Sequence, residues 1–149
     1  MTSAERPAGP RTTAATTVAG LTVFDASAAV WLVLDPGGRG DAVARRIASR
    51  RLAAPALMPF EVANVVRRRC LAGLLAEGQG RLALAGFRAL NIDLWPWDAV
   101  ADGVWAMRES VTAYDASYVA LAQILGVPLV TADLALAKTA SRWCQVEPV

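Results

Sequence analysis

Short apolar segments alternate with longer amphipathic ones along most of the chain. The short segments, residues 21–24, 52–55, 92–95 and 129–131, are typical of buried strands, and residues 144–147 could add a terminal strand. Between them, apolar residues recur at helical spacing over 28–34, 41–51, 59–75, 78–90, 98–108, 116–125 and 134–140. This alternation predicts one α/β domain over residues 20–149, a three-layer α/β/α sandwich with a mostly parallel central sheet.

Residues 1–19 have a different composition from the rest. They consist largely of Ala, Thr, Pro and Gly with scattered charge, and they lack the apolar stretch of a signal peptide. We expect a disordered N-terminal tail, or a start codon placed too early.

The segment from Asp115 to Asp133 forms one connected unit. Asp115 stands just ahead of the helical run 116–125, and Gly126 supplies the left-handed residue that often ends a helix. The strand 129–131 follows, and Asp133 comes just past its end. If the helix runs antiparallel to the strand, both carboxylates lie at the carboxyl edge of the sheet, where α/β proteins place their functional crevice.

The composition excludes several kinds of site. The chain has no histidine, which excludes a His-based triad, a His general base and a His-ligated metal. Cys70 and Cys144 lack zinc-finger spacing and fit a reducing compartment, so we expect a cytoplasmic protein. No apolar run is long enough to cross a bilayer. The net charge of +2 is small, but arginines gather at 45–46, 50–51 and 67–69, where they could meet phosphate or only solvent.

Four acidic residues are expected at one edge of the sheet, each from a separate segment: Asp25, Glu61, Asp115 and Asp133. Singly, each could be a helix cap, a first-turn residue or a turn residue. Together, neighbouring carboxylates would repel by about 3 kcal/mol per pair at ~5 Å and an effective dielectric of ~20. A cation usually holds such a cluster, and all-oxygen ligands suit Mg²⁺ or Mn²⁺. These ions support phosphodiester hydrolysis by activating water and orienting the phosphate.

Three segments that contain these acids resemble the acidic motifs of the PIN-domain family: VFDASAAVWLVL, PFEVANVV and TAYDASYVALAQILGVPLVTAD. Their order and their Asp–Glu–Asp–Asp spacing are also similar. The resemblance covers about residues 21–147, and the subgroup it fits best is the VapC-type toxins of toxin–antitoxin pairs. It implies a PIN-like fold, Mg²⁺-dependent endonucleolytic cleavage of RNA, and a cognate antitoxin that silences the enzyme.

Carried over residue by residue, the resemblance implies that Asp25, Glu61, Asp115 and Asp133 bind the metal and form the catalytic site. Ser27, Asn64 and Thr131 match neighbouring positions and would orient ligands or water. Relatives often carry a further acid after the TAD motif. Residues 134–137 offer none, so a second metal ion lacks this ligand.

Three other functions remain open. A receiver-like α/β binding domain could use an Asp at a strand end with Thr131 and Lys138, but it needs an acidic pair near the first strand, and Asp25 has no acidic neighbour. A catalytically inactive binding module would have lost one of the four acids, and all are present. A structure-specific DNA nuclease of the same fold would need additional DNA-binding elements, for which the chain is short.

Two surfaces are expected to bind partners. Arg67, Arg68 and Arg69 follow Glu61 on one predicted helix and could contact the RNA backbone, or only solvent or an interface. Apolar residues also exceed what the predicted helix faces bury: Trp31, Leu32, Val33, Leu34, Leu71, Leu74, Leu75, Leu82 and Phe87. We expect part of this surface to form a homodimer and another part to receive the antitoxin.

Overall fold

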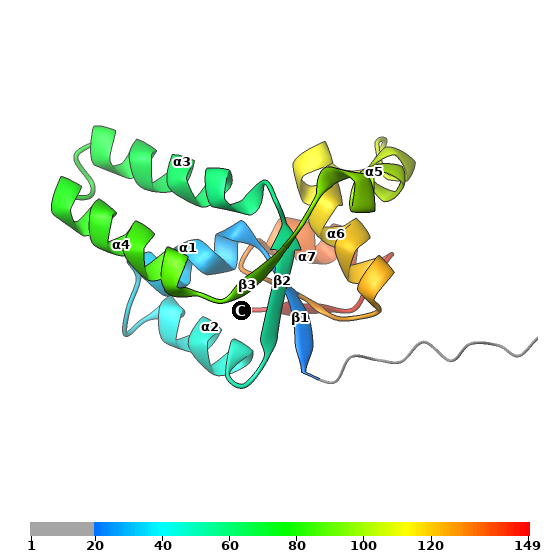
Figure 1. Cartoon of the computed structure of the whole chain (residues 1–149), viewed down its shortest axis with the longest axis horizontal. Helices are drawn as coiled ribbons and strands as arrows, with labels where there is room; N and C mark the ends of the chain where they lie inside the picture. Colours follow the sequence, from blue (N-terminus) through cyan, green and yellow to red (C-terminus); the bar gives the residue numbers. More distant parts are fainter. Residues whose placement is uncertain (1–19) are drawn as a thin grey trace, which may run out of the picture.

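A single parallel sheet organises the chain (Figure 1). In the computed structural model, which describes residues 20–149, its strands lie in the order β3-β2-β1-β4-β5, and every neighbouring pair is parallel. They are β1 (Leu21–Phe24), β2 (Arg51–Pro55), β3 (Ile92–Trp95), β4 (Leu129–Thr131) and β5 (Val146–Pro148). The predicted α/β/α sandwich is confirmed. The predicted tail, residues 1–19, lies outside the described residues.

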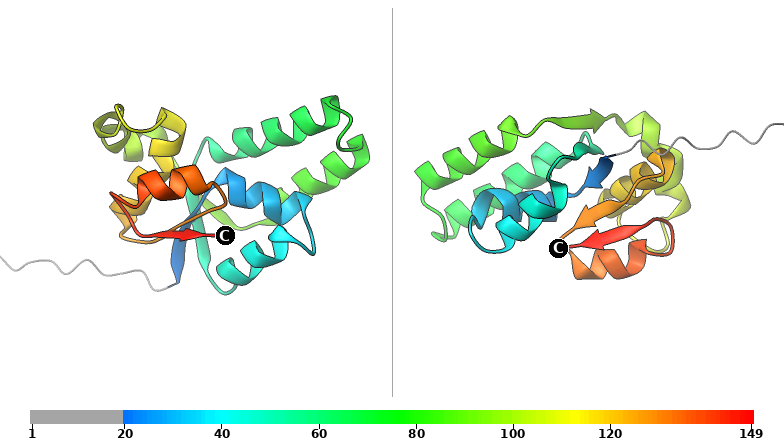
Figure 2. Two further views of the ribbon diagram at one scale, coloured as in Figure 1. Left: turned by 180° about the vertical axis from the view of Figure 1, so that it is seen from behind. Right: turned by 90° about the horizontal axis from the view of Figure 1, so that it is seen from below.

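Helices cover both faces of the sheet, α1 to α4 on one face and α5 to α7 on the other (Figures 1 and 2). They are α1 (Ala26–Leu34), α2 (Arg39–Ile47), α3 (Met58–Leu71), α4 (Glu77–Ala89), α5 (Trp97–Ala106), α6 (Ala113–Leu125) and α7 (Leu134–Ala140). Within residues 20–149, none of them combines the length and the apolar character that crossing a bilayer requires.

Several predicted helix boundaries were wrong, each for a local reason. Helix α2 ends at Ile47 rather than near 51 because Ser49 adopts a positive φ of 62° and Arg51 already pairs in the sheet. Helix α3 ends at Leu71 rather than near 75, shortly before Gly73 with φ 70°. The predicted end of α6 is confirmed, since Gly126 caps it with φ 64°.

The core lies between β1, β4 and α6. All four residues of β1 and all three of β4 are buried, as expected for central strands covered on both faces. Residues 116–122 of α6 are also buried, because this helix packs against the sheet on one side and α5 on another. Helix α5 approaches closely at Gly103, where an added Cβ would lie 2.7 Å from the Cβ of Ala120.

Strands are added to the sheet on both sides of β1, and this places a switch point between β1 and β4. It moves from β1 to β2 and β3 on one side, and returns to add β4 and β5 on the other. At such a point the loops after the two strands separate and leave a crevice at their carboxyl ends. The sheet therefore presents Asp25, which follows β1, beside the residues that follow β4.

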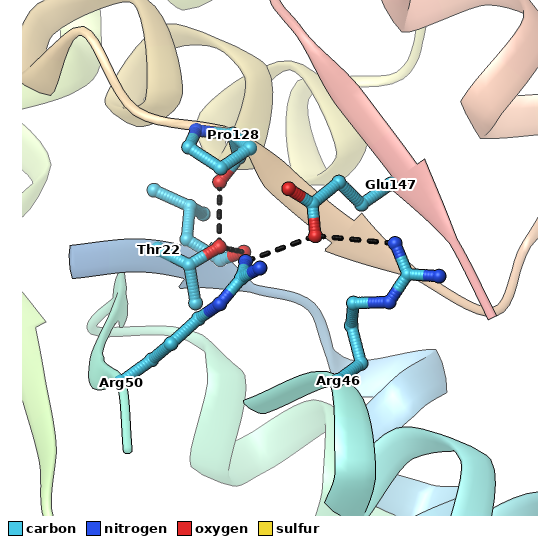
Figure 3. Close-up of polar contacts among 6 residues, drawn as sticks. Thr22, Arg46, Arg50, Pro128 and Glu147 are labelled. Atoms are coloured by element: carbon cyan, nitrogen blue, oxygen red, sulfur yellow. Dashed lines mark hydrogen bonds and ion pairs between the residues drawn. The ribbon is translucent and has the colours of Figure 1, made fainter. Parts of the chain in front are cut away.

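An ion-pair cluster ties the C-terminal strand to α2 and to the segment that follows it (Figure 3). The Oε2 atom of Glu147 lies 2.9 Å from Nη1 of Arg50 and 3.3 Å from Nη1 of Arg46. The Glu147 side chain is only 15% exposed, so these contacts are partly shielded from water. Two of the arginines that could have met phosphate are thus engaged by a carboxylate. Arg51 is also paired, with Asp93 at 2.8 Å.

Candidate active site

Asp25 lies at the switch point and is the most buried of the four acids, 3% exposed. It caps α1 by accepting a hydrogen bond from the Ala28 N–H at 2.9 Å. The hydroxyls of Ser27 and Thr131 donate to its carboxylate at 2.7 and 2.6 Å. Both predicted hydroxyl residues therefore contact Asp25 directly and fix its orientation. Asp25 therefore does cap α1, and this cap position places its carboxylate at the carboxyl edge of the sheet.

The loop after β4 is held to the loop after β1 by the same hydroxyl groups. Ser27 Oγ accepts from the Ala132 N–H at 2.9 Å, and Thr131 Oγ1 accepts from the Asp133 N–H at 3.0 Å. Asp133 then caps α7, where its Oδ1 accepts from the N–H groups of Ala135 and Leu136 at 2.8 and 3.0 Å. Its Oδ2 accepts no hydrogen bond from residues 20–149.

Asp115 is positioned differently from the prediction, which began the helix after it. Helix α6 begins at Ala113, and its N-cap is Thr112, whose hydroxyl accepts from the Asp115 N–H at 3.2 Å. Asp115 therefore lies in the first turn and is not needed as a cap. Its half-buried carboxylate lines the cleft, and a hydrogen bond with the Thr112 side chain opposes the rise in its pKa that burial causes.

Glu61 has a partner that the sequence reasoning missed. The hydroxyl of Tyr118 donates to Glu61 Oε2 at 2.5 Å, and the Tyr118 side chain is 2% exposed. Burial, together with the nearby Glu61 carboxylate, raises the pKa of Tyr118 strongly, so the phenol stays protonated and remains a donor. The signal available in the sequence was its spacing, since Tyr118 stands three residues after Asp115 on one helix.

All four acids line one cleft of about 920 Å³. Ser27, Asn64 and Arg68 line it too, whereas Thr131 is buried behind Asp25. Glu61, Asn64 and Arg68 lie at helical spacing along α3, and all three line this cleft. Arg67 and Arg69 do not line it, and Arg67 Nε instead donates to Asn64 Oδ1 at 3.2 Å. Of the three candidate RNA-contacting arginines, Arg68 alone lies at the site.

The electrostatics of the cleft favour an added cation. Burial is the main cause that raises the pKa values of Asp25, Glu61 and Asp115. Neighbouring carboxylates raise them further, Asp133 acting on Asp25 and Asp115, and Asp115 acting on Glu61. Among the described residues that line the cleft, Arg68 is the only one with a positive charge. Four carboxylates therefore share one lining guanidinium, so most of their negative charge is left without a protein cation in the lining.

The donor set fits Mg²⁺ or Mn²⁺, because it consists of carboxylate, hydroxyl and amide oxygens. As placed, no three Asp, Glu or Cys side chains within residues 20–149 converge closely enough to hold an ion between them. Asp133 Oδ2 and Glu61 Oε1 nonetheless accept no hydrogen bond from residues 20–149, so they can turn toward a ligand. The cleft therefore fits such an ion in the chemistry of its oxygen donors and in their shared location.

Residues 22–141 match a family model described as PIN domain. The chain is 39% identical over 127 residues to Ribonuclease VapC9 of Mycobacterium tuberculosis, a match that covers 85% of this chain and 97% of the relative.

Solved structures share the fold at lower identity. PAE2754 from Pyrobaculum aerophilum superposes with a TM-score of 0.65 at 21% identity, over 91% of this chain and 92% of that chain. Mycobacterium tuberculosis VapC20, described as a sarcin–ricin loop cleaving toxin, superposes with a TM-score of 0.60 at 17% identity, over 85% of this chain and 99% of that chain. Taken together with the four acids in one cleft, these matches place the chain in the PIN-domain family, among its VapC ribonucleases.

Proposed function

We propose that this protein is the toxin of a toxin–antitoxin pair, an endoribonuclease that hydrolyses RNA phosphodiester bonds with the help of Mg²⁺ or Mn²⁺. The observation that carries the proposal is that Asp25, Glu61, Asp115 and Asp133 all line one cleft, together with a single lining arginine. The 39% identity to a ribonuclease over nearly its whole length supports RNA as the substrate. Structure-specific DNA cleavage is the alternative that the same chemistry would allow.

The metal would be held by Asp25, Glu61, Asp115 and Asp133. When bound, such an ion lowers the pKa of a coordinated water and neutralises charge on the phosphate. Ser27 and Thr131 keep the Asp25 carboxylate in place, and Tyr118 keeps Glu61 in place. Asn64 lines the same cleft and can orient a ligand through its amide. Arg68 is positioned to meet a phosphate that the carboxylates would otherwise repel. One ion is favoured over two, because residues 134–137 contribute no further acid.

The proposed partners are the RNA substrate and a cognate antitoxin, with a homodimer as the proposed assembly. Leu71, Leu74 and Leu82 are 74–78% exposed, which leaves an apolar surface on α3, α4 and their connection. A groove of about 510 Å³ between α1 and α4 adds Leu32 and Val33 to this surface. Phe87 does not contribute to it, since its side chain packs in the core at 7% exposed.

The decisive experiment replaces Asp115 by Asn. The substitution removes one charge, and Thr112 still caps the helix. We expect RNA cleavage to fall by at least about 100-fold, and the rise in melting temperature on adding Mg²⁺ to shrink. In EDTA the variant should be as stable as wild type or more so, because a carboxylate with a raised pKa is lost. The matched control is Asp98→Asn, in the first turn of α5 and away from the cleft, which should behave like wild type.

Three outcomes would contradict the proposal. Full RNA cleavage by Asp115→Asn would remove Asp115 from the site, and cleavage of DNA in preference to RNA would select the alternative substrate. Cleavage that persists in EDTA at the wild-type rate would show that no divalent ion is needed.

A further inference from the structure

Two aromatic side chains that line the cleft are exposed to solvent. Phe60 is 77% exposed and Tyr114 is 64% exposed, and both line the cleft that holds the acids. Phe60 immediately precedes Glu61 in the first turn of α3, and Tyr114 immediately precedes Asp115 in the first turn of α6. Each of these two acids thus has an exposed ring beside it in the chain, one on each wall of the cleft.

Neither ring contributes much to folding. The buried face of α3 is formed by Met58, Val62 and Val66, and that of α6 by residues 116–122. The Tyr114 hydroxyl makes no hydrogen bond with residues 20–149, unlike the Tyr118 hydroxyl one turn later. Exposed aromatic surface costs free energy in water, so the paired placement at a cleft points to a ligand with an apolar face.

The charge of the cleft limits what that ligand can be and how it is held. Four carboxylates face one arginine, so a polyanion gains little here from neutralisation by the protein. Stacking on aromatic rings supplies affinity that does not depend on charge, about 1–3 kcal/mol per base. Trp31 also lines the cleft, but the Arg39 guanidinium lies over its ring at 4.5 Å, which occupies that face. Phe60 and Tyr114 are the rings left available.

We propose that Phe60 and Tyr114 are stacking platforms for two bases of the RNA beside the cleaved phosphate. This inference rests on the proposed function and deepens it by naming the side chains that position the substrate. A base inside a duplex presents its faces to its neighbours, so only a splayed base can stack on a protein ring. With one ring next to Glu61 and one next to Asp115, two bases would be held while the phosphate between or beside them faces the acids.

The test measures RNA binding without cleavage, in EDTA. The probes are a short unstructured oligoribonucleotide that carries 2-aminopurine, and a blunt duplex of the same sequence. The variants are Phe60→Leu, Tyr114→Leu and Tyr114→Phe, which keeps the ring. The control is Trp97→Leu, because Trp97 is 60% exposed and does not line the cleft. Melting temperatures check that every variant is folded.

We expect wild type to bind the single strand more tightly than the duplex and to quench the 2-aminopurine. Phe60→Leu and Tyr114→Leu should each weaken single-strand binding by about 10-fold and reduce the quenching, while Tyr114→Phe and Trp97→Leu stay near wild type. Under Mg²⁺, the two Leu variants should show a raised KM for RNA cleavage with little change in kcat.

Unchanged single-strand affinity in both Leu variants would overturn the stacking role, even if wild type cleaves RNA normally. Equal affinity of wild type for the duplex and the single strand would also overturn it, since a paired base cannot stack on these rings. Variants that lose only affinity for an antitoxin, and not for RNA, would assign the rings to a protein interface instead. If wild type cleaves no RNA with Mg²⁺ or Mn²⁺, the proposed function itself fails, which is a different result from any of these.

Discussion

Two regions of this molecule differ in whether their carboxylates are paired with protein cations. At the ion-pair cluster, one carboxylate, Glu147, meets two guanidinium groups within 3.3 Å. In the cleft, four carboxylates share one lining arginine, and burial and mutual repulsion raise the pKa values of three of them. The first arrangement holds a terminal strand in place. The second leaves charge unbalanced inside a partly buried space, which is useful only if a cation or another ligand completes it.

The largest difference should appear when one charge is removed from the cleft. In Glu61→Gln the side chain can still accept the Tyr118 hydrogen bond, but the charge is gone. We expect RNA cleavage to drop by at least about 100-fold, while the free energy of unfolding in EDTA stays equal or increases, since the charged form of a group with raised pKa destabilises the fold. Cleavage assays and urea denaturation measure the two effects. A marked loss of metal-free stability would mean that Glu61 is structural.

Removing the charge at the ion-pair cluster should have the opposite effect on stability. Glu147→Gln leaves Arg46 and Arg50 without their partner and should lower the free energy of unfolding by about 1–2 kcal/mol. The matched control is Glu77→Gln, whose pair with Arg81 is also short, 2.7 Å, but whose side chain is 80% exposed. That control should cost less than about 0.5 kcal/mol. Equal losses in the two variants would show that burial does not distinguish these pairs.

Tyr118→Phe tests how the cleft keeps Glu61 in place. The variant keeps the ring in the core and removes the only hydroxyl that Glu61 contacts within residues 20–149. Because that hydrogen bond lowers the pKa of Glu61, the pKa should rise further in the variant. We expect cleavage to fall by about 10-fold and stability by about 1 kcal/mol. The acidic limb of the pH–rate profile should move to higher pH, a shift that a simple packing defect would not produce.

The smallest effect should be that of pH on the stability of the metal-free protein, measured as the change over one pH unit. The folded pKa values of Asp25, Glu61 and Asp115 lie above those of the unfolded chain, so the native state binds more protons. Their contribution to stability is therefore present at low pH and is lost as pH rises from about 4 through the raised values. Urea denaturation of wild type and Asp115→Asn across this range checks the sign. Wild type should lose more stability than the variant as pH rises.

The sequence predicted the layered fold because its signals were local and agreed with one another. The four apolar strands and the left-handed Gly126 all appear in the structure. Helix starts were harder, because capping depends on which polar side chain the fold brings to the first turn. Thr112, and not Asp115, caps α6, and α5 begins after Pro96 with Asp98 inside its first turn.

The four acids could be predicted as a group because they lie at one edge of a parallel sheet. Their supporting contacts could not, because those contacts join distant segments. Tyr118 meets Glu61 across 57 positions, and Arg50 meets Glu147 across 97. The three consecutive arginines after Glu61 were equivalent in the sequence, and only the helical rotation of α3 separates Arg68 from Arg67 and Arg69. Whether these residues act in catalysis stays a prediction.

The central position of β1 also has a consequence for when the cleft can exist. The first strand to leave the ribosome is the middle one of the sheet, and its neighbour β4 arrives much later, with Thr131 following Asp25 by 106 positions. Until then Asp25 lacks the Thr131 hydroxyl, and Asp115 and Asp133 have yet to join it. A nascent chain therefore carries no complete cleft. The four acids of this cleft can therefore come together only after β4 and Asp133 have been made.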